Sequence, residues 1–180
     1  MIFSHKILYL IILVSIACTS CSSNKKLTDE VKNQNEIDAP CTDSGNSDHK
    51  FFRACANATS NNISLSKEKA IAEAKTQIAK QIINDTRLAA TQYATYMLIA
   101  DKQSFYKTME LAANKTADTV LKGIRPICEK YSEANGRYTT YISLEIDKQT
   151  VLSELNRRAI SLIQDFNGTE FGKSFCNRDN

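Results

Sequence analysis

The chain is poor in the residues on which several functions depend. Its 180 residues include no tryptophan, two histidines, two prolines and five glycines. Scarce glycine and proline favour a helix-rich body and leave no glycine-rich loop of the kind that cradles phosphate. The net charge is only +3, with acids and bases interspersed, whereas a nucleic-acid-binding protein needs a clustered basic face. The composition therefore argues against a nucleic-acid-binding protein.

Residues that could catalyse a reaction or bind a metal are equally few. His5 lies in the apolar N-terminal segment, and His49 is the one histidine downstream of it. A hydrolase needs a nucleophile with a base beside it. The four cysteines after the N-terminal segment are isolated and form no CxxC pair of the kind that suggests a zinc site. Glu129 and Glu145 are expected on opposite faces of one hairpin, where they cannot act jointly as acid and base. We therefore predict no enzyme, no metal and no cofactor.

The N-terminal apolar run is too short to cross a bilayer as a helix, which takes about 20 residues. It spans residues 7–17, follows Lys6, and is followed by small residues, cysteines and a polar stretch. This order is typical of a bacterial secretory signal, and the cysteines make it resemble a lipoprotein signal. We predict a lipoprotein signal peptide over residues 1–17. An ordinary secretory signal and an uncleaved anchor are the alternatives.

Two cysteines compete as the lipidation site. Cys18 is predicted, because Ala17 ends the apolar run directly before it; Cys21, which a serine-rich spacer follows, is the alternative. Several acyl chains anchor a protein lastingly where a single chain does not. The residue directly after the acylated cysteine is Thr19 or Ser22, depending on which cysteine is acylated. Neither is the aspartate that resembles an inner-membrane retention signal in Gram-negative lipoproteins. We therefore expect a lipid anchor in the outer membrane with the domain facing the periplasm; a surface-facing domain stays open.

The rest of the chain divides by composition. Residues 18–46 are polar and rich in Asn, Asp, Ser and Lys. They bury too little apolar surface to fold, so we predict a lipidated flexible tether, which Cys41 would pin to the domain. The folded domain is predicted over residues 47–168, and a polar C-terminal tail over residues 169–180.

Apolar periodicity predicts the elements of this domain. A strand is expected over residues 49–60, where apolar residues alternate. A helix begins near Leu65, with a kink or a short break near Asn84 and Asp85 where the phase of the apolar pattern blurs. Another helix covers about residues 104–122, and the last begins near Asp147 and ends at Asn167. The stripe of the first helix comprises Ile71, Ala74, Ile78 and Ile82; that of the second comprises Phe105, Met109, Ala112, Thr116 and Val120.

A β-hairpin is the clearest local signal. Asn135 and Gly136 separate two extended runs, residues 124–132 and 137–146. Asn-Gly favours a type I′ turn, which needs positive φ at both residues. Ile127 then lies opposite Leu144. Helices on one face of a small antiparallel sheet of about three strands make an α+β domain, preceded here by a disordered tether.

The cysteines after the signal suggest disulfides, because an even set in an oxidising compartment usually pairs. The four are Cys41, Cys55, Cys128 and Cys176. Cys55 and Cys128 are expected on the open face of the sheet. If their strands are neighbours they can bond, which leaves Cys41 and Cys176 to join the two tails. Free buried thiols are the alternative.

The same open face would present aromatic and basic side chains. They are Phe51, Arg53, Asn57, Lys130 and Tyr141. Such a surface could dock an envelope protein or a glycan. An ordinary solvated sheet face is the alternative interpretation.

Several motifs together resemble a known family. The alanine-rich strand at residues 51–58 leads into a helix with Ala72, Ala74, Gln77, Ile78 and Ala79. Leu121, Gly123 and Ile124 follow, and residues 136–145 read Gly-Arg-Tyr-x-x-Tyr-Ile-x-Leu-Glu. Over about residues 50–152 the chain resembles the Lpp-twenty family of bacterial outer-membrane lipoproteins, which is related to flagellar outer-membrane proteins. The resemblance implies an envelope lipoprotein with no catalytic residues to carry over.

These observations predict a lipid-anchored cell-envelope lipoprotein that acts as a non-catalytic structural or binding module. The flagellar relatives imply an alternative, a subunit of a multi-subunit envelope assembly that forms homo-oligomers. An envelope enzyme is the remaining alternative. The expected partners are the membrane and an envelope protein or glycan, with no nucleic acid.

Overall fold

A computed structural model describes residues 40–176. The predicted signal peptide, both candidate lipidation cysteines Cys18 and Cys21, and most of the predicted tether lie outside these residues. The described elements are, in order, η1 (Asp43–Gly45), β1 (Phe51–Ser60), α2 (Ile63–Tyr96), α3 (Lys102–Val120), β2 (Arg125–Ala134), β3 (Arg137–Asp147), α4 (Lys148–Leu162) and α5 (Gly168–Cys176).

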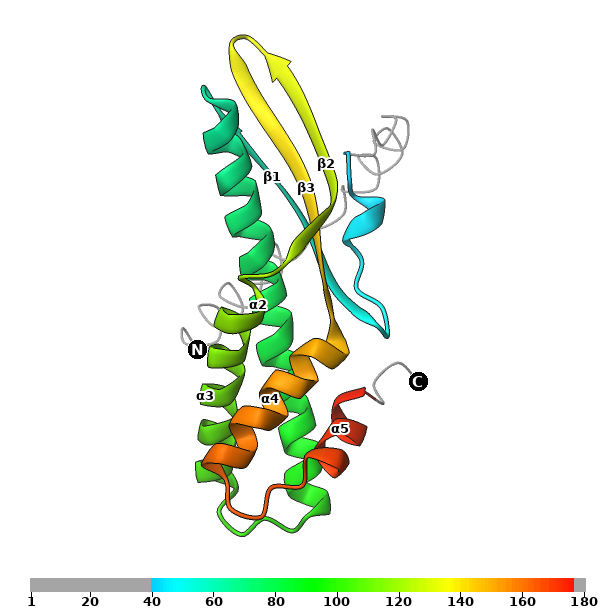
Figure 1. Ribbon diagram of the computed structural model, residues 1–180, viewed down its shortest axis with the longest axis vertical. Helices are drawn as coiled ribbons and strands as arrows, with labels where there is room; N and C mark the ends of the chain where they lie inside the picture. Colours follow the sequence, from blue (N-terminus) through cyan, green and yellow to red (C-terminus); the bar gives the residue numbers. More distant parts are fainter. Residues whose placement is uncertain (1–39, 177–180) are drawn as a thin grey trace, which may run out of the picture. The chain divides into compact units, whose positions relative to one another are not determined.

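These elements form the predicted α+β fold, which is confirmed. The sheet is antiparallel, with β3 between β1 and β2. The first part of α2 covers one face of the sheet, and its second part packs with α3, α4 and α5 in a helical layer beyond the end of the strands (Figure 1).

Helix α2 runs without interruption for 34 residues. It begins where Oδ1 of Asn62 accepts a hydrogen bond from the backbone N of Leu65 at 3.1 Å. The predicted kink near Asn84 is wrong. Ile82, Thr86 and Ala89 are all buried, so the buried stripe passes through these residues at helical spacing, and packing on that side keeps the helix intact.

The hairpin between β2 and β3 has the predicted turn. Asn135 and Gly136 have φ angles of 52° and 70°, as a type I′ turn requires. The predicted pairing of Ile127 with Leu144 is wrong, because a bulge at this residue brings Pro126 opposite Leu144. Between the turn and the bulge the pairing is regular, and Cys128 pairs with Ser143.

The helical layer encloses an aromatic cluster around Tyr93. The ring of Tyr93 lies 5.6 Å from that of Phe105, 5.4 Å from that of Phe166 and 5.9 Å from that of Phe171, centroid to centroid. Its hydroxyl accepts a hydrogen bond from the backbone N of Asn167 at 2.9 Å. Tyr93 thus buries its ring without leaving its polar atom unpaired.

The prediction of a polar C-terminal tail over residues 169–180 is wrong for residues 169–176, which belong to helix α5. Asn167 does not terminate α4; its Oδ1 accepts hydrogen bonds from the backbone N atoms of Thr169 and Glu170, both at 3.1 Å, and so starts α5. Phe171 and Phe175, one helical turn apart, are both buried in the core. The folded unit therefore extends to Cys176 and does not end at residue 168.

Replacing Phe171 by alanine should cost about 3–5 kcal/mol of unfolding free energy, the usual loss for a buried phenylalanine. Urea unfolding followed by circular dichroism measures this loss. Ile160→Ala is the control, since Ile160 is 61% exposed and its truncation should change the midpoint little. Equal midpoints for the two variants would show that α5 is not part of the core.

Candidate functional site

The sheet face opposite the helices holds every residue of the predicted binding surface. Alternation along the strands places Phe51, Arg53 and Asn57 of β1 on this outer face, while Phe52 and Ala54 are buried on the other. Tyr141 pairs with Asn57 on one side and with Lys130 on the other. These three side chains therefore form one row across the sheet, which we call the open row.

A second row lies next to the open row, about 7 Å away along the strands. Cys55, Ser143 and Cys128 are paired across it. A third row contains Arg53 and Glu145. The predicted binding surface is thus divided, with the cysteine row between its two parts.

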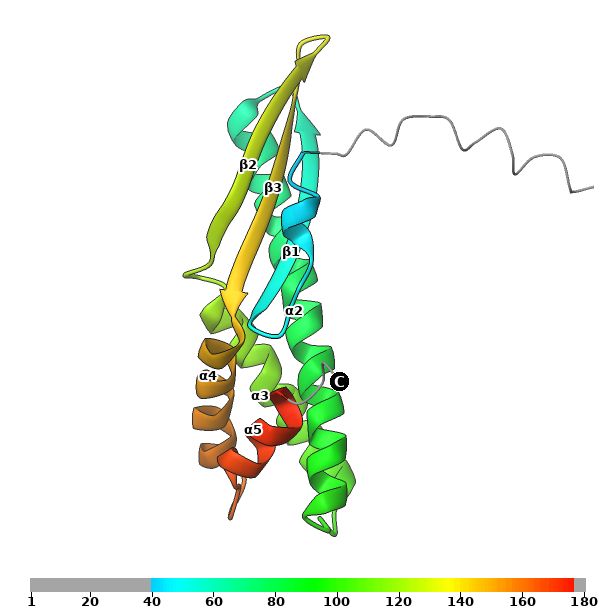
Figure 2. The ribbon, with the colours of Figure 1, turned by 90° about the vertical axis from the view of Figure 1, so that its right-hand side faces the viewer.

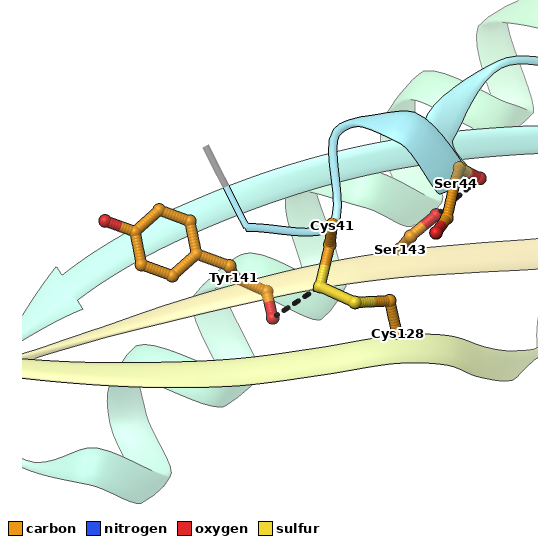
Figure 3. Close-up of a disulfide and its surroundings, with 5 residues drawn as sticks. All are labelled: Cys41, Ser44, Cys128, Tyr141 and Ser143. Carbon is orange, nitrogen blue, oxygen red and sulfur yellow. Dashed lines mark hydrogen bonds between the residues drawn. A yellow bond between two sulfur atoms is a disulfide. The ribbon is translucent and has the colours of Figure 1, made fainter. Parts of the chain in front are cut away.

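Residues 41–48, here called the strap, cross the cysteine row on the outer face (Figure 2). A disulfide joins Cys41 of the strap to Cys128 of β2, with their Cα atoms 5.5 Å apart. In the middle of the sheet, Oγ of Ser143 donates a hydrogen bond to the carbonyl O of Ser44 at 2.9 Å (Figure 3). Because the strap lies on it, Ser143 is completely buried although it points away from the helices.

The strap makes two further contacts around the Cys41 sulfur and over β1. Sγ of Cys41 lies 3.8 Å from the carbonyl O of Tyr141; this is a contact and not a hydrogen bond, because a disulfide sulfur carries no proton. Gly45 lies so close to β1 that a Cβ atom there would be 2.6 Å from Sγ of Cys55. Only glycine fits this crossing without movement of the cysteine.

The far end of the strap is fastened to β1 and to α2. The backbone N of Arg53 donates to Oγ of Ser47 at 2.8 Å, and this hydroxyl lies 2.7 Å from Oε1 of Gln81. Nε2 of Gln81 donates to the carbonyl O of Arg53 at 2.9 Å. The outward-facing N–H and C=O groups of Arg53 are therefore satisfied, and this part of the β1 edge cannot accept another strand.

The side chain of Arg53 is held within the fold. Its Nε donates to Glu145 and its Nη1 to Asp48, both at 2.6 Å, and Nη1 also donates to the carbonyl O of Asn46 at 3.2 Å. The guanidinium lies 4.9 Å from the centre of the Phe51 ring. Phe51 and Arg53 thus fix the strap to the sheet, whereas Asn57 and Lys130 of the open row are exposed.

The fold lowers the pKa of Asp48 in the strap. Hydrogen bonds from the backbone N atoms of Lys50 and Phe51, together with the Arg53 side chain, lower the pKa of Asp48 to about 2. The hydrogen bond to Glu145, followed by that to Asp48, raises the pKa of Arg53. Asp48 and Arg53 therefore stay ionised, and paired, well into the acidic range.

Both predicted disulfide pairings are wrong. Cys55 does not pair with Cys128 because β3 separates their strands, which puts the two Cα atoms roughly 10 Å apart, beyond the reach of a disulfide. Cys41 pairs with Cys128, so it does not join Cys176. Cys55 and Cys176 are free thiols, the former partly buried under the strap and the latter exposed at the end of α5. The predicted attachment of Cys41 to the domain is confirmed, while the predicted tether before residue 40 lies outside the described residues.

The predicted separation of the two hairpin acids is also observed. Glu129 faces α2, where its Oε1 lies 2.6 Å from Nζ of Lys67, while Glu145 lies on the outer face with Arg53. His49 is exposed between the strap and β1. Within residues 40–176, no three His, Cys, Asp or Glu side chains are grouped as metal ligands.

No helix of the described segment has the length and hydrophobicity of a membrane span. A cavity of about 220 Å³ lies between α2 and α3, lined by Ile83, Arg87, Ala90, Thr91, Tyr106, Met109 and Glu110.

Comparison of the chain with models of known protein families and with curated protein sequences gives no match.

Removal of the disulfide should destabilise the domain by about 2–5 kcal/mol, because the bond closes a loop of 87 residues in the unfolded chain. Urea unfolding of Cys128→Ser against the native protein measures the loss. Cys176→Ser is the matched control, since this exposed thiol is free. Peptide mapping without reductant should link the peptides of Cys41 and Cys128; a link between Cys55 and Cys128 would contradict the structure.

Asp48→Asn should lower stability in a pH-dependent manner. A carboxyl whose pKa is lowered on folding stabilises the protein above its unfolded pKa and loses this contribution as the pH falls through its folded pKa. The native protein should therefore exceed the variant in urea midpoint at neutral pH, and the difference should shrink between about pH 4 and about pH 2. Asp43→Asn, which removes the same charge elsewhere in the strap, is the control; the same pH dependence in both differences would contradict this assignment.

Proposed function

We propose that the protein is a lipid-anchored lipoprotein of the bacterial cell envelope whose domain acts as a non-catalytic structural or binding module. The Cys41–Cys128 disulfide is the observation that supports this most. Disulfides persist in oxidising compartments such as the periplasm, which agrees with the secretory signal over residues 1–17. The bond also lies where the proposed tether would enter the domain, so it would fix the direction from which the anchor approaches.

The anchor of this proposal is the acylated thiol of Cys18, with Cys21 as the alternative. A polar segment follows both cysteines and continues to the strap. Such a segment lets the domain stand away from the membrane while it stays attached. We propose the outer membrane, with the domain facing the periplasm.

The open row is the proposed docking surface for an envelope protein or a glycan. Tyr141 offers a ring and a hydroxyl, Lys130 a charge, and Asn57 an amide, a combination that suits polar ligands with an apolar face. Arg53, which the sequence also suggested, is paired with Asp48 of the strap, and its guanidinium lies over the ring of Phe51. The proposed surface is therefore narrower than the sequence alone suggested.

A subunit of a multi-subunit envelope assembly is the second candidate function. Strand β2 lies at an edge of the sheet, where Ile127 and Tyr131 are 43% and 47% exposed. Exposed apolar residues on an edge strand suit a contact with another protein. In that case the purified protein would be an oligomer, whereas the module with a separate ligand would be a monomer.

Mass spectrometry of the N-terminal peptide from the membrane fraction should find acyl chains on Cys18. Cys18→Ala should abolish the modification and release the protein from the membrane, since the apolar surface of the acyl chains would hold it there. Cys21→Ala is the matched control and should remain acylated. Acylation that survives Cys18→Ala and is lost in Cys21→Ala would move the anchor to Cys21; an unmodified, soluble mature chain would refute the proposal.

A further inference from the structure

Three cysteines meet on the outer face of the sheet. Cys55 of β1 and Cys128 of β2 lie on either side of Ser143 in the cysteine row. Cys41 of the strap is bonded to Cys128 above this row, and its Sγ also lies 3.8 Å from the carbonyl O of Tyr141 in β3 (Figure 3). The Cys41 sulfur therefore lies against the strand that separates the other two cysteines.

The strap also lies directly on the free thiol of Cys55. At Gly45 the backbone comes so close that an added Cβ atom would be 2.6 Å from Sγ of Cys55, and Gly45 follows Cys41 by four residues. One short segment thus carries Cys41 and contacts both cysteines of the row, Cys128 through a covalent bond and Cys55 through packing. Distance alone does not exclude Cys55 as a partner of Cys41.

Loop length favours Cys55 over Cys128 as that partner. Cys41 precedes Cys55 by 14 residues and Cys128 by 87. In a flexible chain the shorter loop closes about fifteen times more readily, because the entropic cost of closure rises with the logarithm of the loop length. The bond to Cys128 therefore depends on the folded arrangement, in which β3 holds β2 beneath the beginning of the strap.

The two ends of the strap are fastened to different strands. The far end is fixed to β1 and α2 through Ser47. The near end, residues 41–45, is fixed to β2 through the disulfide and to β3 through the hydrogen bond between Ser143 and Ser44. From Ser47 back to Cys41 the chain can span about 20 Å, and the two candidate partners are roughly 10 Å apart across two strand spacings. The near end can therefore move from β2 to β1 while the far end stays in place.

We propose that Cys41 changes its disulfide partner between Cys128 and Cys55, so that the strap is a thiol–disulfide switch. When the near end lifts from the sheet, the thiolate of Cys55 attacks Sγ of Cys41. The Cys41–Cys55 bond forms as the Cys41–Cys128 bond breaks, and Cys128 leaves as a thiolate that takes up a proton equivalent to the one Cys55 lost. No external oxidant or reductant is consumed, and the lipid anchor takes no part. In the exchanged state Ser143 and Cys128, next to the open row, lose the strap that covers them.

A chain without Cys128 tests the second partner directly. The full-length Cys128→Ser protein is reduced, equilibrated in a glutathione redox buffer without denaturant, alkylated, and mapped by mass spectrometry without reductant. Cys41 should be linked to Cys55 in most chains, because two thiols of one chain have a high effective concentration for each other. The exposed Cys176 should be alkylated. The double variant Cys55→Ser/Cys128→Ser is the matched control and should leave Cys41 alkylated.

Ser143→Ala tests the exchange in a chain that keeps all its cysteines. This variant removes the hydroxyl that holds Ser44 of the strap. The proportion of the Cys41–Cys55 isomer should rise about fivefold in the same redox buffer, the usual effect of one hydrogen bond. Ser132→Ala, which removes an exposed hydroxyl from the same face of the sheet, is the matched control and should leave the proportion unchanged.

The outcomes are distinct. A Cys41–Cys55 link in the folded Cys128→Ser protein, together with the rise in Ser143→Ala, supports the switch. In folded Cys128→Ser, a free Cys41 or a bond from Cys41 to Cys176 or to a second copy of the chain overturns it. If circular dichroism shows that Cys128→Ser is unfolded, Ser143→Ala decides. A Cys41–Cys55 isomer that is absent from this variant, or no more abundant than in its control, overturns the switch.

Discussion

The packing of α2 against β1 and β3 is the contact on which the other elements depend, because α2 alone extends past the end of the sheet into the helical layer. Its sheet-facing positions include Ala70 and Ala74, whose small side chains allow the helix to lie close to the strands. Ser66 and Thr140 share a buried hydrogen bond of 2.7 Å in this interface. The same helix then supplies Tyr93, around which the aromatic residues of α3 and α5 assemble.

Local rules predicted most of the fold from the sequence. The type I′ turn depends on two adjacent residues, and the faces of the strands depend on a period of two, so both were predicted correctly. The kink near Asn84 was wrong because it was inferred from an apolar pattern whose phase blurs beyond this residue, whereas tertiary packing kept the helix continuous. Helix α5 was missed because it is short and polar apart from Phe171 and Phe175, although their spacing after Asn167 was a detectable signal.

The candidate site was only partly predictable. The sequence identified the residues of the outer sheet face, and it identified Cys41 as the residue that pins the N-terminal segment to the domain. The disulfide partner depends on strand order, a long-range property that no local pattern contains. The strap has no periodicity, so nothing in the sequence showed that it would cover the cysteine row and occupy Arg53.

The place of the disulfide has a mechanical consequence. In the anchored form that we propose, any force between the membrane and the domain enters the fold at Cys41. The covalent bond passes this force to Cys128 in β2, which is hydrogen-bonded to β3 along its length. The hydrogen bonds of Ser44 and Ser47 lie after Cys41 in the chain, so they are shielded from the pull. A load on the tether would therefore act on the paired strands and would not peel the strap from the sheet.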